Sequence, residues 1–212
     1  AAGDLFFAIR GERFDGHDFV TGALDCGARG VVVTNRKAVP TPATAVVIIV
    51  QDTVGALQAL AHHVRSGSGT RVIAITGSTG KTSTKEIMAT MLETRYRVAR
   101  NQGNWNNHIG LPLSLLALLA RPELAVVELG MNHVGEIARL VAIAEPDVRV
   151  WTNVGDAHVG LLGSVERVAD AKAEIMEGAT SESLLIANAD DAHVMSRARR
   201  FPGQVVTFGI HA

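Results

Sequence analysis

Short apolar runs recur along the chain, and the segments between them carry apolar residues at helical spacing. In the first quarter, the runs at 5–9, 30–34 and 45–50 predict strands, and a helix is expected from Asp18 to about Cys26. This part of the chain therefore predicts a small α/β unit.

A helix followed by a flexible stretch separates this unit from the rest of the chain. Residues 53–65 have apolar side chains at helical spacing, and the Gly- and Ser-rich stretch 66–70 is typical of a linker. We therefore predict two domains, residues 1–66 and residues 67–212.

The second predicted domain alternates strand-like runs with helical segments. The strands are expected at 72–76, 124–129, 148–153, 183–188 and 204–209. The helices are expected at roughly 82–94, 111–120, 134–144, 164–177 and 191–200. This alternation predicts an α/β fold with a mostly parallel, P-loop-type sheet and helices on both faces. Ligands of such sheets bind at the carboxyl ends of the strands, so motifs that close a strand are informative.

Composition and charge exclude several classes of protein. With 20 Lys and Arg against 21 Asp and Glu, the chain carries no basic footprint for nucleic acid or an anionic membrane surface. No apolar run reaches the length of about 18 residues that a membrane span needs, and no signal peptide is visible. The single cysteine, Cys26, excludes an internal disulfide and is expected to be a small buried apolar residue in a cytoplasmic protein.

A glycine-rich turn, TGSTGKT at 76–82, joins a strand to a helix. Backbone N–H groups and the helix dipole at such a turn favour a phosphate, with Lys81 on the β and γ phosphates and the Thr82 hydroxyl on Mg²⁺. The loop residues expected around the phosphates are Gly77, Ser78, Thr79 and Gly80. The usual P-loop has a glycine six residues before the lysine, where this chain has Ile75. A glycine-rich helix start without a ligand is the alternative, and strand, loop and helix together favour nucleotide binding.

Further polar residues close other predicted strands. Glu128 lies in an apolar strand, and a buried carboxylate usually needs a cation as its partner. Mg²⁺ is the natural choice for this cation. The alternative is a glutamate that caps a helix or forms a salt bridge. His158 is expected at the same edge of the sheet. Lys172 lies in an amphipathic helix, where composition alone favours a solvated lysine. Asn188 suits either the edge of a nucleotide base or a helix cap.

Four asparagines precede an apolar helix in the segment 100–116: Asn101, Asn104, Asn106 and Asn107. Asparagine favours turns and caps, so a structural role is expected for one or two of them. Their concentration around Trp105 indicates a polar wall of a substrate site.

Taken in order, six motifs resemble the Mur ligase family, the ATP-dependent amide-forming enzymes that build the peptide of the bacterial cell-wall precursor. The motifs are ITGSTGKTSTKE, GNWNNHIGLPLSLL, ELGMNHVGEI, TNVGDAHVG, AKAEI and NADD. The family loop is T-G-x-x-G-K-T, so Ile75 is a family trait. The segment 5–33 is similar to the UDP-binding domain of the branch that adds D-alanyl-D-alanine. Sibling ligases that add the third peptide residue, and folylpolyglutamate synthases, share the phosphate loop but match the asparagine-rich segment less well.

The resemblance implies a role for each matching residue. Lys81 and Thr82 would hold the ATP phosphates and one Mg²⁺ with Glu128, and His158 would help to hold a second Mg²⁺. Lys172 matches a lysine that is carbamylated in these ligases, which replaces the solvated interpretation. The residues implied in catalysis are thus Lys81, His158 and Lys172, and Asn188 would contact adenine. The residues implied in substrate binding are Asp15, Gly16, His17, Asn104, Asn106 and Asn107.

The implied reaction transfers a phosphoryl group from ATP to the terminal carboxylate of UDP-N-acetylmuramoyl-tripeptide, and the amine of D-alanyl-D-alanine then attacks the acyl phosphate. We expect a monomeric bacterial protein that binds neither nucleic acid nor membrane. The sequence is interpreted as a fragment, without the family's third domain, that does not catalyse ligation alone. An ATP-binding module without turnover remains an alternative. A P-loop kinase or GTPase is disfavoured, because the Walker spacing and an N-K-x-D motif are lacking.

Overall fold

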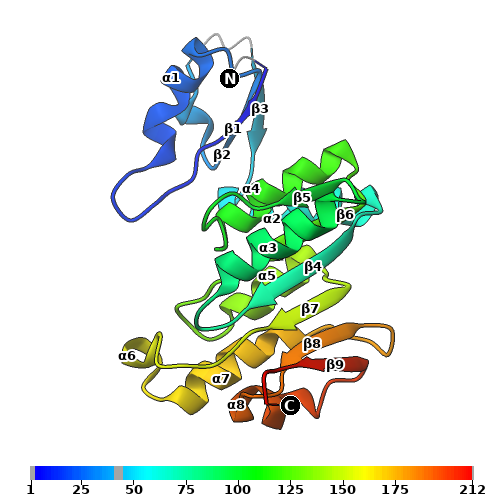
Figure 1. Cartoon of the computed structure of the whole chain (residues 1–212). Coiled ribbons are helices and arrows are strands. Elements are labelled where there is room, and N and C mark those ends of the chain that lie inside the picture. The colour runs from blue at the N-terminus through cyan, green and yellow to red at the C-terminus, as the bar shows by residue number, and fades with distance from the viewer. Residues whose placement is uncertain (1–2, 41–44, 212) are drawn as a thin grey trace. The chain divides into compact units, whose positions relative to one another are not determined.

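The computed structural model describes residues 3–40 and 45–211, and its contacts divide the chain into an N-terminal unit, residues 1–59, and a C-terminal unit, residues 60–212 (Figure 1). The division falls inside helix α2 (Thr53–Ser68). Because α2 extends to Ser68, the first residues of the predicted linker at 66–70 are helical. The helix continues because its end is held: the buried Arg65 guanidinium donates to the carbonyl of Ala144, and the Ser68 hydroxyl donates to the Arg65 carbonyl.

The N-terminal unit is a small α/β structure, as predicted. Its parallel sheet has the order β1 (Leu5–Phe7), β2 (Gly30–Val33) and β3 (Val46–Ile49). The predicted helix is a 3₁₀ turn η1 (Gly16–Phe19) followed by α1 (Val20–Asp25), and a second 3₁₀ turn, η2, spans Arg36–Ala38. Cys26 is exposed at the end of α1, so the expectation of a buried thiol is wrong.

The C-terminal unit contains one parallel sheet of the order β5-β6-β4-β7-β8-β9. The strands are β4 (Arg71–Thr76), β5 (Val98–Arg100), β6 (Leu124–Glu128), β7 (Val148–Trp151), β8 (Leu184–Asn188) and β9 (Gln204–Phe208). The α/β fold and the parallel sheet are confirmed. The edge strand β5 was not predicted, because three residues are too few to give a pattern.

Helices cover both faces of this sheet, because alternate residues of a strand point to opposite sides. On one face, Ile73 and Ile75 pack with Ala89 of α3 (Lys81–Glu93). On the other, Val72 and Ala74 belong to the larger core. Several helices contribute residues to that core, among them α2, α4 (Gly110–Leu115), α5 (Glu136–Ala144), α7 (Val165–Ala173) and α8 (Ala192–Ala198). The 3₁₀ helices η3 (Leu116–Ala120) and η4 (Glu174–Met176) extend α4 and α7, and the short α6 spans Val159–Leu162.

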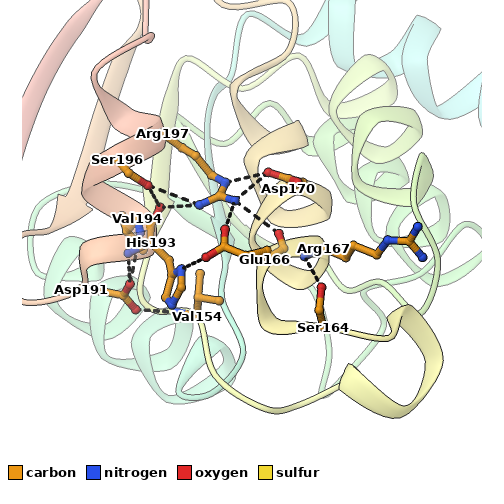
Figure 2. A network of polar contacts seen from close by, with 10 residues as sticks. All are labelled: Val154, Ser164, Glu166, Arg167, Asp170, Asp191, His193, Val194, Ser196 and Arg197. Carbon is orange, nitrogen blue, oxygen red and sulfur yellow. Dashed lines mark hydrogen bonds and ion pairs between the residues drawn. The ribbon is translucent and has the colours of Figure 1, made fainter.

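A charged network joins α7 to α8 (Figure 2). The Arg197 guanidinium donates to Asp170 Oδ1 over 2.8 Å and to Glu166 Oε2 over 2.7 Å, and His193 Nδ1 lies 3.1 Å from Glu166 Oε1. The Arg197 side chain is 14% exposed, whereas Glu166 and Asp170 are largely in solvent. Arg197 therefore fixes the spacing of the two helices that follow β7 and β8.

The central strand β4 ends between the ends of two neighbouring strands. In the register of the sheet, Ile75 pairs with Glu128 of β6 and Thr76 pairs with Trp151 of β7. The chain then turns from Thr76 into α3 through the predicted phosphate loop. Glu128 and the residues after Trp151 therefore flank this loop, at the carboxyl edge where a ligand is expected. Every helix within the described residues is too short or too polar to cross a bilayer.

Candidate functional site

The phosphate loop turns sharply between β4 and α3. A Cβ on Gly77 would collide with Thr152 Oγ1, so only glycine fits there. Gly80 has φ +78°, a left-handed conformation that glycine adopts without strain, and Lys81 then opens the helix. The Lys81 ammonium folds back and donates to the Gly77 carbonyl over 2.9 Å. The loop thus presents the start of a 13-residue helix and a lysine at the end of the central strand.

Thr82 and Glu128, two predicted metal ligands, are in direct contact. The Thr82 hydroxyl donates to Glu128 Oε2 over 2.7 Å, and the Asn106 side-chain amide donates to Oε1 over 2.6 Å. Glu128 is only 2% exposed, which confirms the prediction of a buried carboxylate. Two neutral donors therefore satisfy this carboxylate in the structure.

The asparagine-rich segment divides into structural and site-facing residues, as expected. The buried Asn101 accepts from the Glu128 N–H over 3.1 Å and donates to the Trp105 carbonyl over 3.0 Å. Asn107 Oδ1 accepts from the N–H groups at the start of α4, at 3.1 and 2.8 Å. Asn106 reaches Glu128, and Asn104 is exposed.

Lys85 holds this segment and was not identified from the sequence. It is fully buried in α3, and its ammonium donates to the carbonyls of Asn101 and Gly103 over 2.8 and 2.9 Å and pairs with Glu86 at 3.0 Å. The one sequence feature that could have indicated a role for Lys85 is its spacing from Lys81. It lies four residues after Lys81 and therefore on the same face of the helix.

Lys172 is buried beside the phosphate loop. It is 1% exposed, and its ammonium donates over 3.1 Å to the Gly77 carbonyl, which also accepts from Lys81. Burial, with the nearby Lys81 charge, lowers the pKa of Lys172 to about 8. The interpretation of a solvated lysine from composition is wrong. α7 turns this residue toward the sheet, where Ala171 and Val168 are also buried.

His158 stands at the start of α6 with φ +72°, an unusual conformation for a residue with a side chain. Burial lowers the pKa of His158, and the positive charges of Lys172 and Lys81 lower it further. The imidazole is therefore biased toward its neutral form, which can bind a metal ion through a ring nitrogen.

A cavity of about 970 Å³ opens beside the loop. Lys81 and His158 line it together with the three predicted substrate residues Asn104, Asn106 and Asn107. The structure thus brings a phosphate-loop lysine, the histidine at the start of α6 and a polar wall to one cavity, whereas Glu128 and Lys172 lie outside its lining.

Asn188 acts as a local structural residue here. Its amide donates to the Thr152 carbonyl over 2.9 Å, and its Oδ1 accepts from the Asp190 N–H over 3.0 Å. The sequence left open a base contact or a helix cap. In the structure Asp191 is the N-cap of α8 and Asn188 stabilises the turn before it, and contact with adenine remains a hypothesis.

Asp15, Gly16 and His17 form a network in the N-terminal unit. Asp15 Oδ1 accepts from the His17 N–H over 3.0 Å and lies 2.6 Å from His17 Nδ1, and Thr34 N–H donates to His17 Nε2 over 3.0 Å. Nε2 is therefore the acceptor and Nδ1 carries the proton. The hydrogen bonds from the His17 N–H and ring, then from Arg10, hold the pKa of Asp15 far below its usual range. A Cβ on Gly16 would lie 2.6 Å from the Ile9 carbonyl oxygen.

The residues present fit one Mg²⁺ directly. The Thr82 hydroxyl and the Glu128 carboxylate are hard oxygen donors side by side at the phosphate loop, which suits an ion that takes its other ligands from water and phosphate. Among the described residues, no group of three or more His, Cys, Asp and Glu side chains could hold a metal. At the second predicted position, His158 can serve as a ligand, but a protonated Lys172 cannot.

The parallel sheet with this loop at the end of its central strand defines a P-loop-type α/β protein. The model of the Mur ligase middle domain matches residues 75–212, and that of the Mur ligase family catalytic domain matches residues 1–65. The chain belongs to the Mur ligase family.

Relatives and solved structures agree with this membership. The UDP-N-acetylmuramoyl-tripeptide–D-alanyl-D-alanine ligase of Bacillus subtilis is 46% identical over 187 residues, which cover 88% of this chain and 41% of the relative. MurF of Acinetobacter baumannii superposes with a TM-score of 0.90 at 35% identity, over 98% of this chain and 46% of that one. MurF of Thermotoga maritima, solved in complex with ADP, superposes with a TM-score of 0.89 at 34% identity, over 100% of this chain and 48% of that one. The chain thus spans about half the length of the relatives that it matches.

Proposed function

We propose that the chain binds Mg·ATP at the phosphate loop and supplies this site to an ATP-dependent ligase of MurF type. The observation that carries the proposal is the contact between Thr82 and Glu128 at 2.7 Å, beside a loop that ends in Lys81. A hydroxyl and a carboxylate side by side at a phosphate loop are the oxygen donors that the metal of a bound nucleotide takes, which supports the proposal. The ADP in the T. maritima structure supports the same ligand class.

The proposed reaction joins D-alanyl-D-alanine to UDP-N-acetylmuramoyl-tripeptide. A carboxylate oxygen of the tripeptide forms a bond to the γ-phosphorus, and the bond from that phosphorus to the ADP oxygen breaks. The amine of D-alanyl-D-alanine then attacks the acyl carbon, phosphate leaves, and the amine loses a proton. Phosphorylation is needed because the oxide of a carboxylate is a poor leaving group.

Charge is the main obstacle to the first step, since two anions must meet. Lys81 would place its ammonium on the transferred phosphate, and the cavity beside it would hold the carboxylate against Asn104, Asn106 and Asn107. Mg²⁺, when bound through Thr82 and Glu128, would neutralise further charge on the phosphates. The N-terminal unit, with Asp15, Gly16 and His17, is proposed to bind the UDP sugar.

Lys172 is proposed to react with CO₂. The neutral amine forms an N–C bond and loses a proton, which turns a buried cation into a carbamate anion able to support a second Mg²⁺ with His158. A lysine pKa of about 8 supports this step, because a useful fraction of the amine is then neutral near neutral pH. Incubation with ¹³C-bicarbonate should give a carbamate carbon signal that Lys172→Met removes and Lys37→Met retains.

Nucleotide binding is the decisive test. Calorimetric titration of Mg·ATP into the wild-type chain should give saturable binding, and Lys81→Ala should weaken it by roughly a hundredfold, as expected for a buried charge-assisted contact. Lys37→Ala, which removes an exposed lysine of the N-terminal unit, is the matched control and should bind as the wild type. Equal affinity of Lys81→Ala and the wild type would refute the proposed site.

A further inference from the structure

The loop that follows β7 lies against the phosphate loop along its whole length. Thr152 Oγ1 donates to the Thr79 carbonyl over 3.0 Å, and the Gly155 N–H donates to Ser78 Oγ over 2.8 Å. The Ser78 N–H in turn donates to the Asn153 carbonyl over 3.0 Å. Residues 152–155, which we call the supporting segment, are thus hydrogen-bonded to the phosphate loop.

Asn153 makes the central contacts of the supporting segment. Its Oδ1 accepts from the Ser78 N–H over 3.1 Å, from the Thr79 N–H over 2.9 Å and from the Thr79 hydroxyl over 3.3 Å. Its Nδ2 donates to the Thr79 carbonyl over 3.1 Å. One amide side chain therefore binds both the donors and the acceptor of the two residues at the tip of the loop.

The close approach at Gly77 is independent support for this coupling. A Cβ there would collide with Thr152 Oγ1 and lie 3.2 Å from the Asn153 nitrogen. The glycine is thus required by the supporting segment rather than by the turn alone.

The supporting segment is itself anchored from the opposite side, by the last residue of β8 and by the N-cap residue of α8. Asn188 Nδ2 donates to the Thr152 carbonyl over 2.9 Å, and Asp191 Oδ2 accepts from the Val154 N–H over 2.7 Å. Figure 2 shows Asp191 between Val154 and the first turn of α8, whose N–H groups donate to its other oxygen. The supporting segment is therefore held between α8 and the phosphate loop.

We propose that Asn153 is a positioning residue that sets the phosphate loop for the phosphates of the nucleotide. By binding the N–H groups of Ser78 and Thr79, Asn153 fixes the tip of the loop, so that the N–H groups at the start of α3 and the Lys81 ammonium face the ligand. The phosphate loop is then already ordered in the ligand-free protein, so the free energy of ligand binding is not reduced by the entropic cost of ordering the loop. This inference rests on the proposed function, because it concerns the same site.

The first measurement needs no ligand. Backbone amide exchange is followed by NMR in the ligand-free chain and in Asn153→Ala. The Thr79 amide has Asn153 Oδ1 as its acceptor and should exchange at least about tenfold faster, since a lost hydrogen bond is worth about this factor. The Ser78 amide keeps the Asn153 carbonyl and should change less. Asn153→Asp retains an oxygen acceptor and should keep Thr79 protected.

The second measurement uses two probes, Mg·ADP and adenosine. Asn153→Ala should weaken Mg·ADP by about tenfold and leave adenosine unchanged, because only the phosphates touch the loop. Asn35→Ala removes an asparagine that caps η2 in the N-terminal unit and should change neither affinity. A general loss of fold would instead weaken both probes in Asn153→Ala.

The outcomes separate the two proposals. If the wild type binds Mg·ADP and Asn153→Ala binds it equally, or loses adenosine to the same extent, the positioning role is refuted while the proposed function stands. Unchanged exchange of the Thr79 amide in Asn153→Ala also refutes it. If the wild type itself does not bind Mg·ADP, the proposed function fails first and the positioning role fails with it.

Discussion

The ammonium groups of Lys81 and Lys172 donate to one and the same carbonyl oxygen, that of Gly77, over 2.9 and 3.1 Å. Two cations that share one neutral acceptor repel each other, and among the described residues no carboxylate offsets the charge of Lys172. The site therefore carries positive charge that an anionic ligand would neutralise. This arrangement costs stability in the absence of a ligand, which makes it measurable.

Replacing Lys172 by Met should stabilise the chain at pH 7. The pKa of Lys172 falls from its usual 10.5 to about 8 in the fold, which corresponds to a cost of about 3 kcal/mol while the folded group is kept protonated. Between these two pKa values the unfolded chain binds the extra proton, so the stability of the wild type rises with pH and the advantage of Lys172→Met shrinks. Urea denaturation at pH 7 and pH 10, in CO₂-free buffer, measures both effects.

Lys85→Met is the matched control, because it makes the same change at another buried lysine. Lys85 donates to two carbonyl oxygens, which the substitution would leave without this donor, and it pairs with Glu86, which would keep its contact with Arg100. We expect Lys85→Met to destabilise the chain by about 2–4 kcal/mol. If Lys172→Met destabilised the chain as much as Lys85→Met, the buried Lys172 charge would not be the strained group inferred here.

Thr82→Val should weaken nucleotide binding only when Mg²⁺ is present. The substitution keeps the shape of the side chain and removes the hydroxyl 2.7 Å from Glu128 Oε2. The affinity of Thr82→Val for Mg·ATP should be roughly tenfold lower than that of the wild type. In EDTA, where Mg²⁺ is removed, the variant and the wild type should bind ATP with equal affinity. Calorimetry in the two buffers measures this difference. Thr90→Val, on an exposed position of α3, should change neither value, and an equal loss in both buffers would argue against Thr82 as a metal ligand.

Arg197 should be worth more to stability than either of its carboxylate partners. Its side chain is 14% exposed and bonds both Glu166 and Asp170, which are 64% and 69% exposed. We expect Arg197→Ala to cost about 1–2 kcal/mol and Glu166→Ala to cost less than Arg197→Ala, since exposed ion pairs contribute little. Thermal unfolding at low salt and at 1 M salt tests this, and a larger loss for Glu166→Ala than for Arg197→Ala would contradict it.

Periodicity was sufficient to predict the sheets and most of the helices, because most strands of the C-terminal unit are apolar runs, and β4, β6 and β7 are almost fully buried. It was also sufficient for Glu128, since a charge inside such a run stands out. The pattern did not predict β5, whose three residues are too few, or the end of α2, which depends on a contact from Arg65 to a carbonyl 79 residues away.

The site residues that sequence reasoning missed act through contacts remote in the chain. Asn153 lies in a motif that was noted for His158, and its importance comes from the tip of a loop 74 residues away. Lys85 reads as an ordinary helix lysine, yet it binds carbonyls of the asparagine-rich segment. Composition likewise favoured a solvated Lys172, because the burial of one helical position depends on how the helix is rotated against the sheet.

Gly77→Ala should destabilise the chain and disturb the phosphate loop, because the added Cβ would collide with Thr152 Oγ1. The expected cost is about 1–3 kcal/mol in urea denaturation, typical of a close contact without free space. Gly22→Ala, in a helix where a Cβ would meet nothing within 4 Å, is the control and should be neutral or slightly stabilising.

The double variant Gly77→Ala with Thr152→Ala decides whether this collision is the cause. Removal of the Thr152 hydroxyl and methyl makes room for the new Cβ, so the double variant should be less destabilised than the sum of the two single variants by at least about 1 kcal/mol. Additive losses would mean that the cost arises from the backbone conformation of the loop itself. In that case Gly77 would serve the turn alone, and its contact with the supporting segment would carry no energetic weight.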